Sequence, residues 1–432
     1  MTTATATLPA GPSQTVLRQS LAWGFRPRPF LDACHREFGD MFTIRLGQVG
    51  PVVMLAHPDM IKEVFTGDPA VFHAGEANVI LRPSLGRHSV LLLDDAQHMR
   101  QRKLLLPPFH GERMQRYGEL MREIAEHDIA SWPRGEPFRL HTRTQDVTLT
   151  IIVRAVFGVT DPARGERLRE LLRALLDATA SFGLQFGFML ARRLGAPDPL
   201  EKLRRQRAEI DELLLAEIGE RRATGGGEDI LSLLLDARFE DGAPMADQEV
   251  CDQLVTLLVA GHETTATALA WTLELLVHHP DALARLGDGS DTAYLKAVIN
   301  ESLRLRPVVP LAGRRLSAPL QVDGVELPEG TDVTPAIWLA HTRADVYPDP
   351  FTFRPERWLD GAAPPGYAWV PFGGGVRRCL GAAFAEMEMR VALATMLALV
   401  RVGAATAEPE RVARRNVTFS PARGTRLVAL QR

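Results

Sequence analysis

The sequence predicts a mainly α protein with a minor β-sheet part, folded as a single large domain around a long central helix. Three observations indicate this class. Apolar residues recur at helical spacing between residues 111 and 306, short β-rich runs occur before and after that region, and no long polar linker separates the parts. We expect residues 1–20 to form a flexible N-terminal segment and residues 21–432 to form the domain.

The composition excludes several classes of protein. Of the 432 residues, 46% are apolar and 24% are charged, the proportions of a globular chain that buries a large core. The formal net charge of −3 gives no reason to expect a nucleic acid partner. No apolar run approaches the roughly 20 residues of a membrane span, and the N-terminus does not resemble a signal peptide, so we expect no membrane anchor.

The cysteines indicate the compartment. Cys34, Cys251 and Cys379 are far apart in sequence and form no C-x-x-C pair. This argues against a disulfide framework, a zinc ribbon and an iron–sulfur cluster. We therefore expect a cytoplasmic protein.

The elements follow from local patterns. The β-rich runs at 41–46 and 51–55 predict strands, and the i, i+3, i+4 pattern predicts helices over residues 114–132, 146–157, 165–180 and 199–223. A glycine-rich connection at 224–228 precedes a helix over 246–279, about 50 Å long. The remaining predictions are a helix at 292–305, a β-hairpin within 320–335, an irregular Pro-rich stretch at 347–371 and a last helix at 380–400.

The strongest chemical signal is the run F-G-G-G-V-R-R-C-L-G at residues 372–381. Its glycines allow a tight turn, and Cys379 comes just before the last predicted helix. The positive end of a helix dipole and free backbone N–H groups stabilise a thiolate there, as a metal-ligating cysteine requires. The alternative is a cysteine packed as a small hydrophobe. A phosphate loop is disfavoured because its glycine spacing and its lysine are absent.

This run resembles the haem-binding signature of the cytochrome P450 monooxygenases, F-x-x-G-x-R-x-C-x-G. Phe372, Gly375, Arg377, Cys379 and Gly381 match it position by position. The resemblance implies the cytochrome P450 fold and a heme b cofactor (iron protoporphyrin IX). Cys379 would be the thiolate ligand of the iron, with Phe372, Arg377 and Gly381 around the cofactor.

The long helix carries a polar insertion, A-G-H-E-T-T, at residues 260–265. Helix propensity would not select it, because glycine costs about 1 kcal/mol in a helix and threonine is β-branched. It is similar to the family motif on the oxygen side of the haem. By that resemblance Ala260 contacts the haem, Thr264 hydrogen-bonds dioxygen, and Glu263 helps to deliver protons through water. The zinc-protease motif H-E-x-x-H lacks its second histidine here.

Haem propionates need cationic partners or strong donors. His98 and Arg102 lie four residues apart, share a helical face and resemble the family's propionate-binding helix. Arg377 is expected to join them. Arg314 is the fourth expected partner, although the adjacent Arg315 leaves that assignment open.

Two further segments resemble a structural charge network of the family. Glu301 and Arg304 form its E-x-x-R helix, and Arg357 lies in a P-E-R-W segment. We assign these three residues to folding and haem retention and to no chemical step.

The substrate pocket is assigned by resemblance alone. Its candidate residues are apolar, which favours a lipophilic small molecule such as a fatty acid, terpenoid, steroid or polyketide. The candidates are Phe182, Phe186, Leu257, Val309 and Phe419.

The resemblance implies a haem-thiolate monooxygenase that inserts one atom of O2 into its substrate by hydroxylation or epoxidation. The sequence contains no motif for an electron-donating cofactor, so we expect a ferredoxin and an NAD(P)H-dependent ferredoxin reductase as partners. A basic face would attract the acidic partner, and it comprises Arg100, Lys103, Arg113, Arg116 and Arg378. We expect a monomer. Two alternatives are a peroxide-using enzyme of the same fold and a non-catalytic haem sensor.

Overall fold

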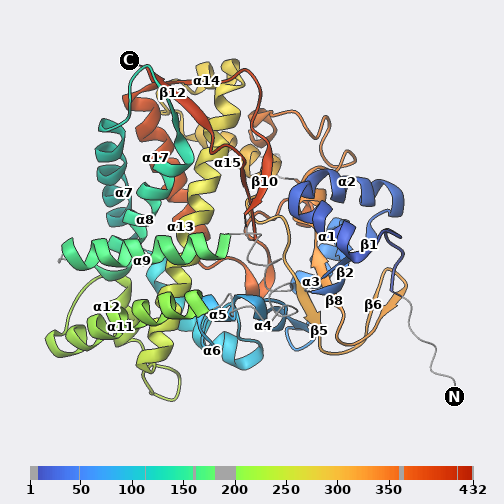
Figure 1. The fold of residues 1–432 in the computed structure, drawn as a ribbon, viewed down its shortest axis with the longest axis horizontal. Helices are drawn as coiled ribbons and strands as arrows, with labels where there is room; N and C mark the ends of the chain where they lie inside the picture. Colours follow the sequence, from blue (N-terminus) through green and yellow to red (C-terminus); the bar gives the residue numbers. More distant parts are fainter. Residues whose placement is uncertain are drawn as a thin grey trace.

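A computed structural model describes most of the chain. The described residues are 8–47, 49–111, 113–158, 162–180, 201–359, 364–415 and 417–430. Long helices occupy one side of the molecule, and a smaller β-rich part lies on the other side (Figure 1). The predicted mainly α class with a minor sheet part is confirmed.

The helices predicted from periodicity are present, with ends within a few residues of the predicted ones for most of them. The helices are α1 (Val16–Phe25), α2 (Pro27–Phe38), α3 (Pro58–Thr66), α4 (Ala74–Ala77), α5 (Arg82–Leu85), α6 (Asp95–Leu105), α7 (Arg113–Ala130), α8 (Leu140–Phe157), α9 (Pro162–Ala180), α11 (Glu201–Thr224), α12 (Ile230–Asp236), α13 (Asp247–Val277), α14 (Pro280–Leu286), α15 (Thr292–Leu305), α16 (Ile337–His341) and α17 (Ala382–Leu399). None of the described helices is long and apolar enough to cross a membrane.

The described residues form four small sheets beside the helices, and the largest has the strand order β1-β2-β8-β5-β3. The strands are β1 (Met41–Leu46), β2 (Gly50–Leu55), β3 (Phe72–His73), β4 (Pro137–Arg139), β5 (Arg314–Leu316), β6 (Leu320–Val322), β7 (Val325–Leu327), β8 (Asp332–Pro335), β9 (Arg401–Ala404), β10 (Val412–Arg415), β11 (Thr418–Pro421) and β12 (Arg426–Leu430). The predicted hairpin at 320–335 divides: β6 pairs with β7, whereas β8 runs parallel to β2 in the large sheet.

The N-terminal region differs from the expected flexible segment of residues 1–20. Helix α1 starts at Val16, and Gln19 is completely buried. The Gln19 amide donates to the carbonyl of Pro12 (3.0 Å) and its oxygen accepts from the Arg45 N–H of β1 (2.8 Å). The Gln19 side chain thus bonds to the backbone of the N-terminal segment and to the backbone of β1. Residues from Ala10 onward pack against β1.

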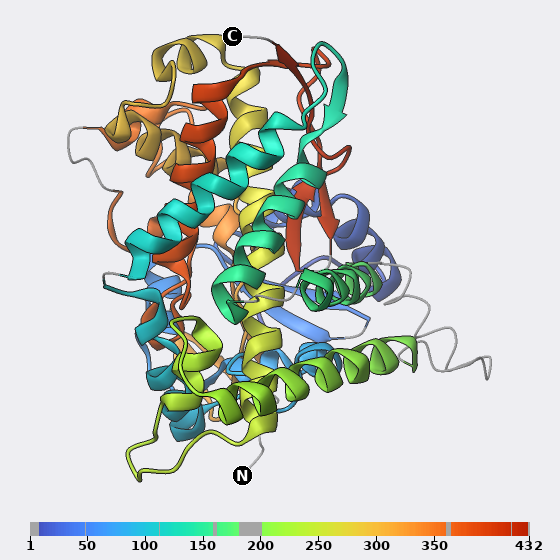
Figure 2. The same ribbon diagram turned by 90° about the vertical axis from the view of Figure 1, so that its left-hand side faces the viewer.

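Helix α13 runs through the helical part of the molecule, with α8 packed along it (Figure 2). Thr144 and Thr148 of α8 donate their hydroxyls to the carbonyls of Ala266 and His262 of α13, at 3.0 and 3.2 Å. Residues 250–258 and 265–276 of α13 are buried, whereas Ala260 between them is exposed. The middle of the central helix is therefore accessible although both flanks are core.

Candidate active site

The cysteine loop is a tight turn that leads into α17. Gly373 and Gly375 have φ of 66° and 61°, and a Cβ at Gly375 would overlap the carbonyl oxygen of Phe65. Only glycine fits there without moving backbone. The Cys379 N–H donates to the Phe372 carbonyl (2.9 Å), and the Cys379 side chain is exposed. The turn thus presents the sulfur, three residues before the first residue of α17.

Opposing effects act on the Cys379 thiol. Although the residue is accessible, the chain packed around its sulfur partly desolvates it and raises its pKa, while the Gly381 backbone N–H and the positive charges of Arg378 and Arg102 lower it. Arg102 also donates to the Arg378 carbonyl (2.7 Å), which fixes α6 against the cysteine loop. Binding of a metal ion to the sulfur would favour the thiolate further.

A basic cluster lies next to this loop. His98 of α6 and Arg314 of β5 are buried in it, and Arg102 of α6 and Arg377 are half-buried. Burial, the main cause, lowers the pKa of both Arg314 and Arg377 to about 10, and the charge of Arg377 contributes to the lowering for Arg314. Burial and the three arginine charges lower the pKa of His98 to about 3, so its imidazole is neutral.

The cluster holds three positive charges, and Asp94 is the carboxylate paired with it, 2.5 Å from Arg377. Such a group of partly buried like charges suits a ligand that brings carboxylates of its own. The two propionates of haem meet this requirement, and the exposed Cys379 sulfur offers a soft ligand for its iron. The residues present therefore fit haem.

The structure separates the two adjacent arginines of β5. Arg315 pairs with Asp332 of β8 through two hydrogen bonds of 2.9 and 2.6 Å. Arg314 is buried on the opposite face, where the charge of Arg377 lowers its pKa and where its own charge lowers the pKa of His98. Arg314 is thus the one placed with the other three candidates.

We expect Arg314→Met to weaken haem retention about tenfold or more, because a hydrogen bond to a charged group contributes about 1.5–3 kcal/mol. The rate of haem transfer to apomyoglobin measures this. Arg315→Met is the matched control, since it removes an arginine that is bonded to Asp332. Equal haem loss in both variants would contradict the assignment.

The polar insertion lies within an unbroken helix, so α13 has no local opening at residues 260–265. The Thr264 hydroxyl donates to the Ala260 carbonyl (2.7 Å), a bond that satisfies the hydroxyl within the helix. Glu263 faces α8 instead: its Oε2 accepts from the Gln145 amide at 2.7 Å. Thr264 and Glu263 therefore point to different neighbours, although they are adjacent in sequence.

The predicted pocket residues are not all brought together. Phe182 and Phe186 lie outside the described residues. Leu257 is a buried residue of α13, and Val309 is half-buried in the segment after α15.

Phe419, the last of the predicted pocket residues, packs in a hydrophobic core cluster. It is 2% exposed and its ring centroid lies 6.1 Å from that of Trp23. Its carbonyl accepts from the indole N–H of Trp271 (2.8 Å) and its N–H donates to Val308 (2.7 Å). These two hydrogen bonds tie the backbone of Phe419 to the Trp271 side chain of α13 and to the backbone of Val308.

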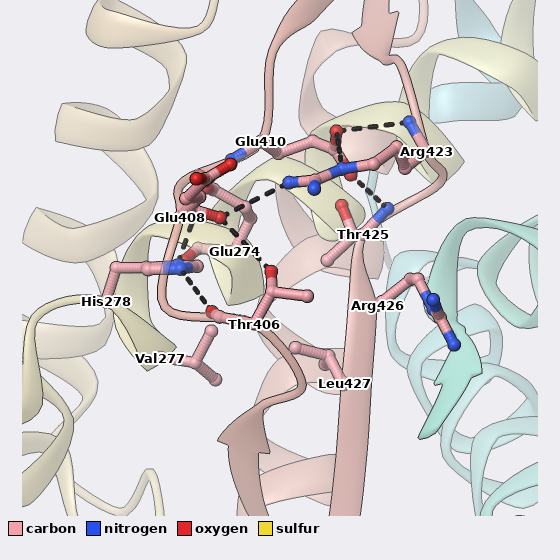
Figure 3. A pocket seen from close by; sticks show the side chains of 10 residues that line it. All are labelled: Glu274, Val277, His278, Thr406, Glu408, Glu410, Arg423, Thr425, Arg426 and Leu427. Atoms are coloured by element: carbon pink, nitrogen blue, oxygen red, sulfur yellow. Dashed lines mark hydrogen bonds and ion pairs between the residues drawn. The ribbon is translucent and has the colours of Figure 1, made fainter.

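A small polar pocket lies at the C-terminal half of α13 (Figure 3), and it contains none of the predicted site residues. There Glu410 accepts hydrogen bonds from the backbone N–H groups of Arg423 and Thr425, and Glu274 accepts from the N–H of Glu410 (2.8 Å). The hydrogen bonds around the pocket join α13 to the C-terminal strands. The pocket is separate from the cysteine loop.

The predicted basic face is partly neutralised. Arg100 pairs with Asp241 (2.9 Å), Lys103 pairs with Glu240 (2.5 Å), and Arg116 pairs with Glu228. These side chains are largely exposed, so each pair contributes little to stability. They nevertheless reduce the positive potential that an acidic partner would meet.

Sequence reasoning missed Gln145, His141 and Arg415, which surround Glu263. Their contacts with Glu263 span more than 115 positions along the chain. The spacing of four between His141 and Gln145 places both on one helical face, which is a weak sequence signal.

A helical protein that offers one accessible cysteine to a metal, beside a basic cluster suited to carboxylates, is a protein of the haem-thiolate class. The model of the cytochrome P450 family matches residues 9–421. This chain belongs to the cytochrome P450 family, and is thus a haem-binding oxidoreductase and monooxygenase.

Similar proteins and structures also belong to the cytochrome P450 family. Cytochrome P450 135B1 of Mycobacterium tuberculosis is 42% identical over 97% of this chain and 91% of its own length. Cytochrome P450 137 of the same organism is 41% identical over 91% and 83%. The structure of retinoic acid bound cyanobacterial CYP120A1 superposes with a TM-score of 0.86 at 26% identity, covering 99% of this chain and 100% of that one.

Proposed function

We propose that this chain inserts one oxygen atom of O2 into a lipophilic small molecule, by hydroxylation or epoxidation. The observation that carries the proposal is the combination of the exposed Cys379 with the exposed Ala260 of α13, four residues before Thr264. The proposed cofactor is heme b. Its surroundings would be Cys379 on the iron, Phe372, Gly381 and Ala260 around the ring, and His98, Arg102, Arg314 and Arg377 at the propionates.

The proposed partners are a ferredoxin and an NAD(P)H-dependent ferredoxin reductase, with the protein working as a monomer in the cytoplasm. Its three cysteines are free, in keeping with a reducing compartment. A lipophilic substrate is supported by the apolar Leu257 beside Ala260, and by the structural relative that binds retinoic acid.

When bound, haem supplies the redox chemistry that activates O2. The chain supplies the rest. Cys379 contributes a negatively charged sulfur, and the buried arginines hold the cofactor through its carboxylates. The Thr264 hydroxyl donates its hydrogen bond to the Ala260 carbonyl. The lone pairs of its oxygen therefore remain available as acceptors. Glu263 holds and releases protons at its carboxyl group, while apolar α13 residues exclude bulk water from the substrate.

We expect Thr264→Ala to lower product formed per NAD(P)H consumed by about tenfold or more, with hydrogen peroxide formed instead, because proton delivery loses its positioned hydroxyl. Coupled assays of NAD(P)H, peroxide and product measure this. Thr150→Ala is the control, since its hydroxyl makes the same kind of bond to the carbonyl four residues back (2.8 Å), on α8. An unchanged yield in Thr264→Ala would contradict the role.

The same assays separate the alternatives. Full activity with peroxide alone, undiminished in Thr264→Ala, would favour a peroxide-using enzyme. NAD(P)H consumption that never yields product, with reductase and ferredoxin present and a broad set of lipophilic substrates, would favour a haem sensor.

A further inference from the structure

Glu263 lies in a polar part of the interface between α8 and α13. Its side chain is 13% exposed. Its Oε2 accepts from the Gln145 amide at 2.7 Å, while its Oε1 lies 3.7 Å from His141 Nε2 and 3.8 Å from Arg415 Nε. Among these three contacts the Gln145 amide is the only one at hydrogen-bond distance.

His141 is not a cation that could form an ion pair with Glu263. Burial and the charge of Arg415 lower the pKa of His141 to about 4, so the imidazole is neutral at ordinary pH. Its Nε2 lies 3.1 Å from the Thr267 hydroxyl, which ties the ring to the next turn of α13. His141 therefore shapes the site of Glu263 without adding a charge to it.

The other charged and titratable groups nearby come from four elements. They are Asp146 of α8 with its partner Arg173 of α9 at 2.5 Å, Arg415 of β10, and His262 of α13. Burial lowers the pKa of His262 to about 3, so it too is neutral. Arg415 keeps a side-chain exposure of 30%, so solvent screens its charge.

We propose that Gln145 is a positioning residue for Glu263: its amide holds the carboxyl in the α8–α13 interface, beside Thr264, and stabilises its ionised form. This inference rests on the proposed role of Glu263 in proton delivery. A donor that bonds to a carboxylate favours the charged form, and a bond of 2.7 Å to a partly buried carboxylate is of the strong, charge-assisted kind.

Two variants of Gln145 distinguish the effect of its amide donor from the effect of its side-chain shape. Gln145→Leu removes the amide donor, and the carboxyl of Glu263 should then accept a proton more readily. Gln145→Glu keeps the shape but places a second carboxyl next to the first, so the pair should hold a shared proton to still higher pH. The expected order of proton affinity is Gln145→Glu above Gln145→Leu above the parent protein.

The decisive readout is an infrared pH titration of the resting haem protein, with Glu263→Gln as the subtracted reference. We expect the carboxylate band assigned to Glu263 to lose intensity at a pH about one unit higher in Gln145→Leu than in the parent, and higher again in Gln145→Glu. Gln101→Leu is the matched control, because it removes an amide-to-carboxylate bond of 3.0 Å to Glu249, also on α13. A midpoint that stays unchanged in both Gln145 variants would overturn the inference.

Product yield per NAD(P)H as a function of pH gives the second readout, and its acid limb should move in the same order. If Glu263→Gln keeps the parent's pH profile, the proposed role of Glu263 fails, while the infrared titration still decides the role of Gln145. If Glu263→Gln abolishes the limb and the Gln145 variants leave it in place, the inference fails and the proposed function stands.

Discussion

Replacing Cys379 with Ser is expected to abolish the strongly red-shifted Soret band that the reduced protein should show under carbon monoxide, and monooxygenase activity with it. A thiolate donates far more electron density to haem iron than an alcohol does, and this donation underlies both the spectrum and O–O cleavage. The difference spectrum of the reduced protein with carbon monoxide measures the effect directly.

The structure supplies a control for this experiment. Cys34 is a free, buried cysteine of α2, packed with Phe42 and Trp338 in the β-rich core. Cys34→Ala should therefore leave the red-shifted band intact. A parent protein that binds haem with an unshifted band would mean that another residue holds the iron. Absence of haem from the parent protein would leave Cys379 as an unligated thiol.

Local patterns predicted much of the fold. The helix at 292–305 has the predicted bounds, because its apolar face repeats regularly and Asp291 caps its first turn through the N–H groups of Ala293 and Tyr294. Helix α1 was not predicted, because its stability depends on Gln19 bonding to β1, which is a tertiary contact. The packing of Phe419 against Trp23 is likewise a tertiary contact that local patterns did not predict.

The site shows the same division between local and tertiary information. The cysteine loop is encoded within ten residues, so the sequence was sufficient to find it. Arg314 and Arg315 could not be told apart, because adjacent strand residues point to opposite faces and only the pairing partner decides which face is which. In the structure Arg315 lies opposite Asp332 in the ladder, and this register directs Arg314 toward the basic cluster.

The second large effect is expected at the network of Glu301 and Arg304, which the sequence assigned to folding. Both side chains are completely buried and share two hydrogen bonds of 2.7 Å. Glu301 also accepts from the indole of Trp358 (2.9 Å) and from Arg357 (3.3 Å). Arg304 donates to the carbonyl of His341, the last residue of α16, and to the carbonyls of Pro350 and Thr352, which follow that helix.

Replacing Glu301 with Gln should therefore lower the free energy of unfolding by about 3–5 kcal/mol, because it leaves the guanidinium of Arg304 buried without a counter-charge. That is a large part of the stability of an ordinary domain, so we expect low yields of folded protein and poor haem retention. Urea unfolding followed by far-UV circular dichroism, compared at equal haem content, measures the loss.

Glu356→Gln is the matched control for this experiment. It breaks the exposed ion pair with Arg285 (2.8 Å, side chains 44% and 48% exposed) and should cost less than about 1 kcal/mol. If Glu301→Gln unfolded at nearly the same urea concentration as Glu356→Gln, the buried pair would not hold this part of the fold together. The double variant Glu301→Gln/Arg304→Met should then be no more stable than Glu301→Gln, whereas a buried uncompensated charge predicts that it recovers part of the loss.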